Sequence, residues 1–201
     1  MDPVVVWRRP PKSGRATPLV VFLHGRGADE HDLIDLADRL PRSFAYASVR
    51  APVAVPGGGF TWFENSGPAR PIPASVRRSV GDLRAWLDKT TSAPCFLFGF
   101  SAGMMMAAAL VLDDPARFSG AVLLSGAIAF DAGIATTPQR LAGLPVFYGH
   151  GTHDVVIPPE LVRRTLAYLK DQSGAALTLR EYPHEHAISN REMADIAAWF
   201  G

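Results

Sequence analysis

Short apolar runs of strand length alternate with longer amphipathic stretches along nearly the whole chain. We expect strands at residues 4–8, 19–24, 44–49, 95–100, 120–124, 146–148 and 177–182. Helices are expected at residues 30–40, 73–90, 102–112, 159–172 and 189–200. This alternation is typical of a mostly parallel sheet with helices on both faces. The pattern therefore predicts an α/β fold, in which ligands bind beyond the carboxyl ends of the strands.

Composition fits one domain over residues 1–201. The chain has 201 residues, 48% of them hydrophobic, which is enough for one sizeable core and short for two. The net charge is +1, and no basic run or zinc-spaced cysteine set points to nucleic acid. The start of the chain does not resemble a signal peptide, and no apolar run approaches a membrane span. We therefore expect a cytoplasmic protein without stable membrane insertion, as a monomer or homodimer.

The strongest chemical signal is a serine between the strand at 95–100 and the following helix. Residues 99–103 read Gly-Phe-Ser-Ala-Gly, and a turn this tight needs small neighbours around its serine. Such a nucleophile elbow holds the Ser101 hydroxyl above the end of the strand. The backbone N–H of Ala102 lies at the start of the helix, whose dipole favours negative charge. The segment predicts a nucleophilic serine, although glycine and serine also occur in ordinary turns.

A nucleophilic serine needs a histidine base and a carboxylate, and candidates for both follow later in the chain. Asp154 comes just after a predicted strand and is the acid that we predict. An aspartate there also suits a turn or a helix cap before Pro158. The base is expected on the loop after the last strand, where His184 and His186 both qualify.

A glycine-rich turn follows the strand at 19–24 and resembles an oxyanion-hole loop. Residues 24–27 read His-Gly-Arg-Gly, and this flexible turn lets the N–H of Arg26 point beside that of Ala102. The alternative is a plain turn between a strand and a helix, with Asp29 as the helix cap. The serine elbow and the two downstream sites favour the oxyanion hole.

Together these stretches resemble the phospholipase/carboxylesterase family of α/β-hydrolases, which includes bacterial carboxylesterases and acyl-protein thioesterases. The matching stretches occur in order at residues 23–27, 50–52, 57–63, 99–103, 149–158 and 181–186. The resemblance implies an α/β-hydrolase fold and a catalytic triad of Ser101, Asp154 and His186. The family's last motif has glycine before its histidine, whereas this chain has Glu185.

The connection at residues 51–73 is long and rich in proline and glycine, as is common in binding loops. We predict that its Trp62 and Phe63 line an acyl pocket; alternatively, they attach the loop to the core. The run of three methionines after the elbow suits core packing, and of these we expect Met104 to reach the substrate. No large lid domain is apparent, so we expect a modest pocket for short or medium acyl chains.

The predicted reaction is hydrolysis of a small-molecule carboxylic ester or thioester. His186 takes the Ser101 proton while Asp154 orients the imidazole. The N–H groups of Arg26 and Ala102 bind the oxyanion. Water then cleaves the acyl-enzyme, so we expect neither a metal nor an organic cofactor.

Three alternative hypotheses use the same residues or the same scaffold. A metal-dependent hydrolase would use a cluster made of His150, His153, Asp154, His184 and His186. A non-catalytic α/β-hydrolase-fold binding protein would keep a pocket without chemistry, although no triad or oxyanion residue is missing here. Acyl transfer to an alcohol or amine would use the same groups as hydrolysis.

Overall fold

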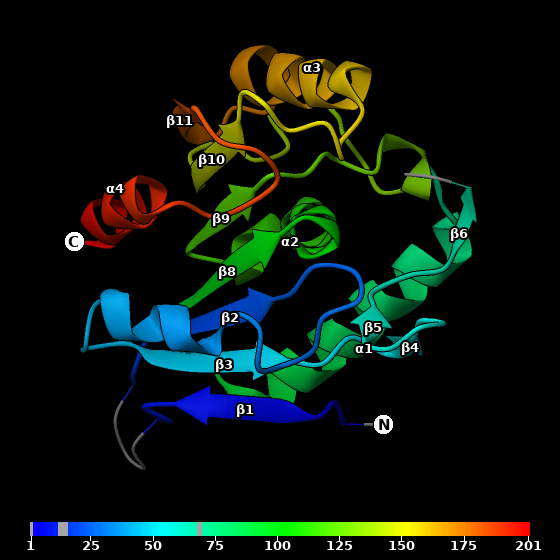
Figure 1. Cartoon of the computed structure of the whole chain (residues 1–201). Coiled ribbons are helices and arrows are strands. Elements are labelled where there is room, and N and C mark those ends of the chain that lie inside the picture. Colours follow the sequence, from blue (N-terminus) through cyan, green and yellow to red (C-terminus); the bar gives the residue numbers. More distant parts are fainter. Residues whose placement is uncertain (1, 12–15, 68–69) are drawn as a thin grey trace.

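A seven-stranded sheet forms the centre of the protein. The computed structural model describes residues 2–11, 16–67 and 70–201. The strand order is β1-β3-β2-β8-β9-β10-β11, and all neighbours are parallel except β1, which runs antiparallel to β3 (Figure 1). The strands are β1 (Val5–Arg8), β2 (Leu19–Leu23), β3 (Ala45–Val49), β8 (Cys95–Phe100), β9 (Gly120–Leu124), β10 (Pro145–Gly151) and β11 (Ala176–Tyr182). The predicted α/β fold with a mostly parallel sheet is confirmed.

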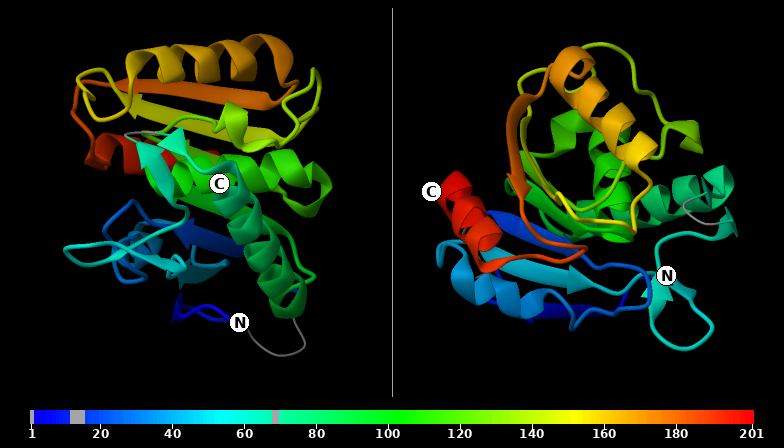
Figure 2. Two further views of the ribbon diagram at one scale, coloured as in Figure 1. Left: turned by 90° about the vertical axis from the view of Figure 1, so that its right-hand side faces the viewer. Right: turned by 45° about the horizontal axis from the view of Figure 1, so that its top comes forward.

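Helices cover both faces of this sheet, as predicted. One apolar cluster packs α1 and α2, with part of α3, on one face, and a second packs η1 and α4 on the other (Figures 1 and 2). The α-helices are α1 (Pro73–Thr90), α2 (Ala102–Asp113), α3 (Pro159–Ala167) and α4 (Asn190–Phe200). A π-helical turn, Tyr168–Gln172, continues α3. None of the helices in the described ranges has the length and apolarity needed to cross a bilayer.

The sheet brings distant parts of the chain together at its carboxyl edge. Strands β2, β3 and β9 are buried at every position, because helices cover a parallel sheet on both sides. In the sheet order, β2, β8, β9, β10 and β11 are consecutive neighbours. The loops that follow these strands therefore meet at one edge, although they span more than 160 residues of sequence.

The predicted helix at residues 30–40 is wrong in type and length. The structure has a 3₁₀ helix, η1 (Ile34–Arg39), held by bonds such as Leu40 N–H to the Ala37 carbonyl. Its buried positions Ile34, Ala37 and Leu40 are three residues apart, which is the period of a 3₁₀ helix. The residues before it form turns, and there the buried Glu30 carboxylate accepts a 2.6 Å hydrogen bond from Arg50.

The long connection at residues 51–73 contains two small hairpins. One pairs β4 (Val53–Ala54) with β5 (Phe60–Thr61), and the other pairs β6 (Asn65–Gly67) with β7 (Arg70–Pro71). Residues 68–69 of the connection lie outside the described residues. The hairpins lie beyond the carboxyl ends of β2 and β3 in Figure 1. They are small additions to the rim of the sheet, and no large lid domain is present in the described ranges.

Candidate active site

Ser101 stands on a strained turn between β8 and α2. Its backbone has φ 57° and ψ −119°, a combination that residues with side chains rarely adopt. The Ser101 N–H donates to the Leu124 carbonyl at 2.9 Å, which attaches the turn to β9. Gly103 allows the close packing beneath it, because a Cβ there would collide with the carbonyl oxygen of Leu23. The structure thus has the geometry of a nucleophile elbow at the predicted position.

His186 and Asp154 complete a chain of short polar contacts with Ser101. His186 Nε2 lies 2.9 Å from Ser101 Oγ, and His186 Nδ1 lies 2.7 Å from Asp154 Oδ2. Asp154 Oδ1 accepts hydrogen bonds from the N–H groups of Val156 at 2.8 Å and Ile157 at 3.3 Å. A carboxylate at Nδ1 places the proton on that nitrogen and leaves Nε2 able to accept one. The arrangement can therefore withdraw the proton of the serine hydroxyl.

His184 makes different contacts from His186, although both lie on the same loop. Its Nδ1 lies 2.7 Å from the Glu185 carbonyl, and its Nε2 lies 3.4 Å from Glu192 Oε2. The ring stacks on Tyr182 at 5.7 Å between centroids. Of the two candidate bases, the structure places His186 beside Ser101 and turns His184 toward α4.

The glycine-rich turn after β2 lies directly against the serine. A Cβ on Gly25 would be 3.5 Å from Ser101 Cβ, so the two loops lie close together with room for little more than a methyl group. Among the described residues, the backbone N–H groups of Arg26 and Ala102 have no hydrogen-bond partner. Ala102 is the first residue of α2, where backbone N–H groups lie free at the positive end of the helix dipole. Both groups are therefore available to a developing oxyanion.

His24 holds this turn in place and was named in the sequence only as part of a motif. Its side chain is fully buried, and burial lowers its pKa, so the ring is neutral at neutral pH. Nδ1 lies 2.7 Å from the Gly25 carbonyl, while Nε2 accepts the Ala51 N–H at 3.1 Å. The neutral tautomer with its proton on Nδ1 satisfies both contacts.

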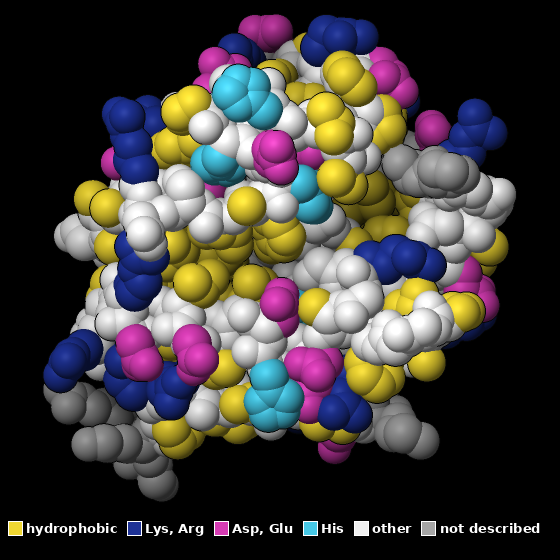
Figure 3. All heavy atoms as spheres, in the orientation of Figure 1, with side chains coloured by type: hydrophobic (Ala, Val, Ile, Leu, Met, Phe, Trp, Pro, Cys, Tyr) yellow, Lys and Arg dark blue, Asp and Glu magenta, His cyan; other side chains and the backbone are white. Residues whose placement is uncertain are grey.

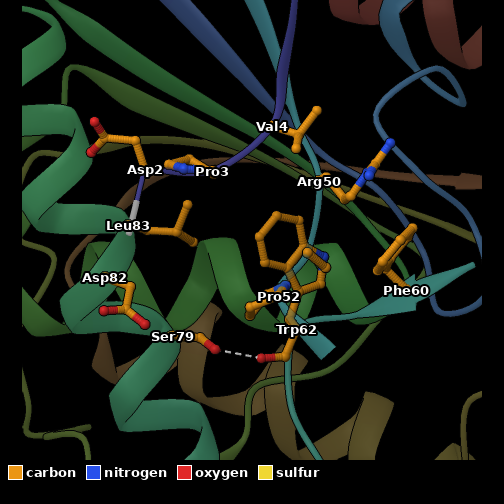
Figure 4. Close-up of a pocket in the computed structure, with 11 residues that line it drawn as sticks. Asp2, Pro3, Val4, Arg50, Pro52, Phe60, Trp62, Ser79, Asp82 and Leu83 are labelled. Atoms are coloured by element: carbon orange, nitrogen blue, oxygen red, sulfur yellow. Dashed lines mark hydrogen bonds between the residues drawn. The ribbon is translucent and has the colours of Figure 1, made fainter. Parts of the chain in front are cut away.

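The three predicted substrate-binding residues are all buried. Trp62, Phe63 and Met104 have exposed fractions of 0%, 3% and 0%. The Trp62 indole N–H donates to the His24 carbonyl at 2.8 Å. Trp62 also lines a cavity of about 270 Å³ that is bounded by the start of the chain, residues 50–52 and α1 (Figure 4). None of the predicted triad or oxyanion-loop residues lines that cavity, and none lines the groove described next.

A larger groove of about 620 Å³ lies between the second hairpin, the loop after β9 and α3. Met105, one of its lining residues, lies in the first turn of α2, and its N–H donates to the Ser101 carbonyl at 3.2 Å. Its apolar lining residues are Pro71, Pro73, Met105, Ile128, Ala129, Phe130, Pro158 and Leu161. In Figure 3, recessed hydrophobic atoms lie beside the histidines on this face. These residues come from segments far apart in the chain, so no local sequence pattern groups them.

The residues of the alternative metal-site hypothesis do not form one cluster in the structure. Within the described part of the chain, no three His, Cys, Asp or Glu side chains are arranged to hold a metal ion. His150 Nε2 faces Glu181 Oε1 at 3.3 Å, and His184 faces Glu192. His186 and Asp154 contact each other.

The parallel sheet, the strained serine turn and the serine–histidine–aspartate contacts define an α/β-hydrolase scaffold. The family model described as Phospholipase/Carboxylesterase matches residues 10–200. The chain belongs to this family.

Relatives and solved structures agree with this assignment. Carboxylesterase SOBER1 of Arabidopsis thaliana is 30% identical over 63% of this chain and 58% of its own length. Acyl-protein thioesterase 1 of Cryptococcus neoformans is 24% identical over 91% of each chain. A rice relative, described as a probable inactive carboxylesterase, is 28% identical over 80% of this chain and 75% of its own. The chain thus spans little more than half of SOBER1.

Two solved carboxylesterases have the same fold. The Bacillus cereus enzyme superposes with a TM-score of 0.84 and 23% identity, over 98% of this chain and 92% of its own. The Mesorhizobium loti enzyme has a TM-score of 0.81 and 25% identity, over 92% of this chain and 88% of its own. These superpositions confirm the predicted α/β-hydrolase fold.

Proposed function

We propose that this protein is a serine hydrolase that cleaves carboxylic esters or thioesters through an acyl-enzyme on Ser101. The observation that carries the proposal is the continuous contact from Ser101 Oγ through His186 to Asp154, at 2.9 and 2.7 Å. The strained turn beneath Ser101 supports it, because strain of this kind is characteristic of functional sites. Membership in the phospholipase/carboxylesterase family agrees with the same chemistry.

In the proposed mechanism, His186 Nε2 accepts the hydroxyl proton as Ser101 Oγ attacks the carbonyl carbon. Asp154 stabilises the imidazolium that forms and keeps the ring oriented. The oxyanion accepts hydrogen bonds from the free N–H groups of Arg26 and Ala102. The imidazolium protonates the leaving alcohol or thiol, and water activated by the same histidine then releases the acid from Ser101.

We propose that the 620 Å³ groove binds the acyl chain. Most of its lining residues are apolar, which suits a hydrocarbon, and Met105 belongs to the first turn of the helix that follows Ser101. A groove of this size fits short or medium chains within the range of small-molecule pockets. Trp62, Phe63 and Met104 are buried and do not line this groove, so they are not part of the proposed acyl site. The cytoplasmic location and the monomeric or homodimeric state stay predictions.

The test is labelling with a fluorophosphonate, read by intact mass and peptide mapping, together with p-nitrophenyl ester turnover. One adduct on Ser101 is expected, and Ser101→Ala should lose the adduct and about 10⁴-fold or more in kcat. Ser92→Ala, an exposed serine before β8, is the matched control and should label and turn over like the wild type.

Other results would point to other functions. A wild type that folds but neither labels nor turns over would support a non-catalytic binding protein. Turnover that survives Ser101→Ala and is lost with a chelator would support the metal-dependent alternative.

A further inference from the structure

Glu192 is a buried carboxyl group that the proposed mechanism does not use. It lies in the first turn of α4 with an exposed fraction of 0%. Its backbone N–H donates to Ser189 Oγ at 3.1 Å, and its Oε2 accepts the Ser189 N–H at 3.4 Å. Gly149 of β10 makes room for it, because a Cβ there would collide with Glu192 Oε1. A capping residue on an exposed helix end does not require such a buried niche.

The side chain of His184 faces this carboxyl group at 3.4 Å, from Nε2 to Oε2. The other ring nitrogen, Nδ1, lies 2.7 Å from the Glu185 carbonyl, which can only accept a hydrogen bond. Nδ1 therefore carries a proton. The contact at Nε2 is then favourable only when a second proton lies on either Nε2 or Glu192.

This proton is available near neutral pH. Burial raises the pKa of Glu192 to about 7, and the charge of His184 acts in the opposite direction. The other titratable groups around the pair are Tyr182, which stacks on the His184 ring, and Asp195, which accepts the Tyr182 hydroxyl at 2.8 Å. The ring is therefore held between Tyr182 and Glu192.

The backbone of His184 joins the two loops that carry the acid and the base. Its carbonyl accepts the N–H of His153 at 3.1 Å, one residue before Asp154. Its own N–H donates to the Tyr182 carbonyl at 2.9 Å, and His186 follows two residues later. A displacement of His184 therefore changes the positions of both Asp154 and His186.

We propose that His184 and Glu192 form a positioning pair that holds the Asp154 turn and the His186 loop in register for proton transfer. This role rests on the proposed serine-hydrolase function. Neither side chain contacts Ser101 Oγ or lines the acyl groove. The pair therefore acts on kcat through the geometry of the triad, where displacements of about 1 Å can cost about 100-fold.

The experiment measures kcat and KM of the full-length protein on p-nitrophenyl acetate. His184→Ala should lower kcat by about 10- to 100-fold and leave KM within about threefold, since the acyl groove is unchanged. At pH 8, above the raised pKa of Glu192, Glu192→Gln keeps the volume but loses the charge, so kcat should fall in the same direction. The double variant should lose no more than the worse single variant, because the pair acts as one unit.

A conservative variant separates positioning from mere packing. His184→Gln restores an N–H donor toward Glu192 and should recover most of the kcat that His184→Ala loses. This variant and Glu192→Gln also carry the test if His184→Ala does not fold. Glu181→Gln is the matched control, because Glu181 faces His150 at 3.3 Å but is 57% exposed; its kcat should stay within about twofold of the wild type.

Three results would contradict the proposal of a positioning pair while leaving the proposed function intact. These are wild-type kcat in both single variants, losses that multiply in the double variant, or a lower Tm with unchanged kcat. If the wild type itself fails to label with fluorophosphonate and to turn over, the proposed function is refuted, and the pair's catalytic role with it.

Discussion

At the scale of single residues, the serine turn depends on how closely two backbones approach. Gly103 of α2 packs on the carbonyl of Leu23 in β2, so no side chain fits between them. The same contact brings the oxyanion loop against Ser101. A residue without a functional group of its own thereby sets the distance between the nucleophile and its proposed oxyanion donors.

Gly103→Ala should therefore lower both stability and activity. The added methyl group collides with backbone atoms, which cannot move away by a side-chain rotation. We therefore expect a loss of about 3 kcal/mol or more in the free energy of unfolding. Urea denaturation and kcat on a p-nitrophenyl ester measure the two effects.

Gly81→Ala is the matched control for this substitution. Gly81 lies within α1, and a Cβ there would meet nothing within 4 Å. Alanine should stabilise the helix by about 0.5–1 kcal/mol with no change in kcat. If both variants lost stability and activity alike, the close approach of Gly103 to Leu23 would not be the cause of the loss.

The methionines after Ser101 show what the sequence pattern does not predict, namely which side chain of a helix faces the groove. Met104 and Met105 are adjacent and chemically identical, yet Met104 is buried in the core and Met105 lines the groove. Successive helix positions differ in direction by about 100°. Which of the two points toward the groove depends on how α2 is rotated against the sheet.

At the scale of elements, the first turn of α4 links helix capping to the active-site loops. Ser189 and Glu192 form a reciprocal capping box, and the same Glu192 faces His184. The spacing of serine and glutamate is visible in the sequence. The burial of the glutamate is not, because it depends on β10 and on the glycine at position 149.

The burial of Glu192 should make the free energy of unfolding depend on pH. The pKa of Glu192 is raised to about 7 from an ordinary value of 4.5, so the folded protein binds this proton more tightly than the unfolded chain. Its contribution to stability is complete below pH 4.5 and is lost as the pH rises through about 7.

Urea denaturation of the wild type and Glu192→Gln at pH 5 and pH 8 tests this sign. The amide does not titrate, so the stability of the wild type relative to the variant should be greater at pH 5 than at pH 8. An equal difference at both pH values would mean that the carboxyl group titrates normally.

At the scale of the whole molecule, two of the hollows in the described ranges bear on where the acyl chain binds. The 620 Å³ groove adjoins the serine turn, while the 270 Å³ cavity lies behind Trp62 (Figure 4). Of these two, the groove has a lining residue in the first turn of α2, Met105, and no residue that lines the cavity belongs to α2. We therefore expect substitutions in the groove, and not in the cavity, to change acyl-chain preference.

Leu161→Trp should narrow the groove and shift preference toward shorter esters. We expect kcat/KM for a medium-chain p-nitrophenyl ester to fall by about tenfold relative to the acetate, since a lost pocket contact of this size is worth about 1–3 kcal/mol. Val4→Trp, at the half-exposed rim of the other cavity, is the control and should leave the ratio unchanged. The opposite result would place the acyl chain behind Trp62.

The sequence by itself determined the α/β fold, the seven central strands and the serine turn. These follow from local patterns, because apolar runs bounded by glycine turns read as buried strands, and a serine between small residues marks a sharp turn. It also placed Asp154 and His186 on loops beyond strand ends. Between His184 and His186, the residues alone left the choice open, and the family resemblance selected His186.

Only the tertiary structure decided which side chains face one another. It brought His186 to Ser101 and turned His184 to Glu192. The two rings lie on the same loop and differ only in the direction in which they point. It buried Trp62, Phe63 and Met104 and formed a groove from four distant segments. It also made the segment at residues 34–39 a 3₁₀ helix. Each of these depends on packing between elements far apart in the chain. Local sequence patterns contain no information about such packing.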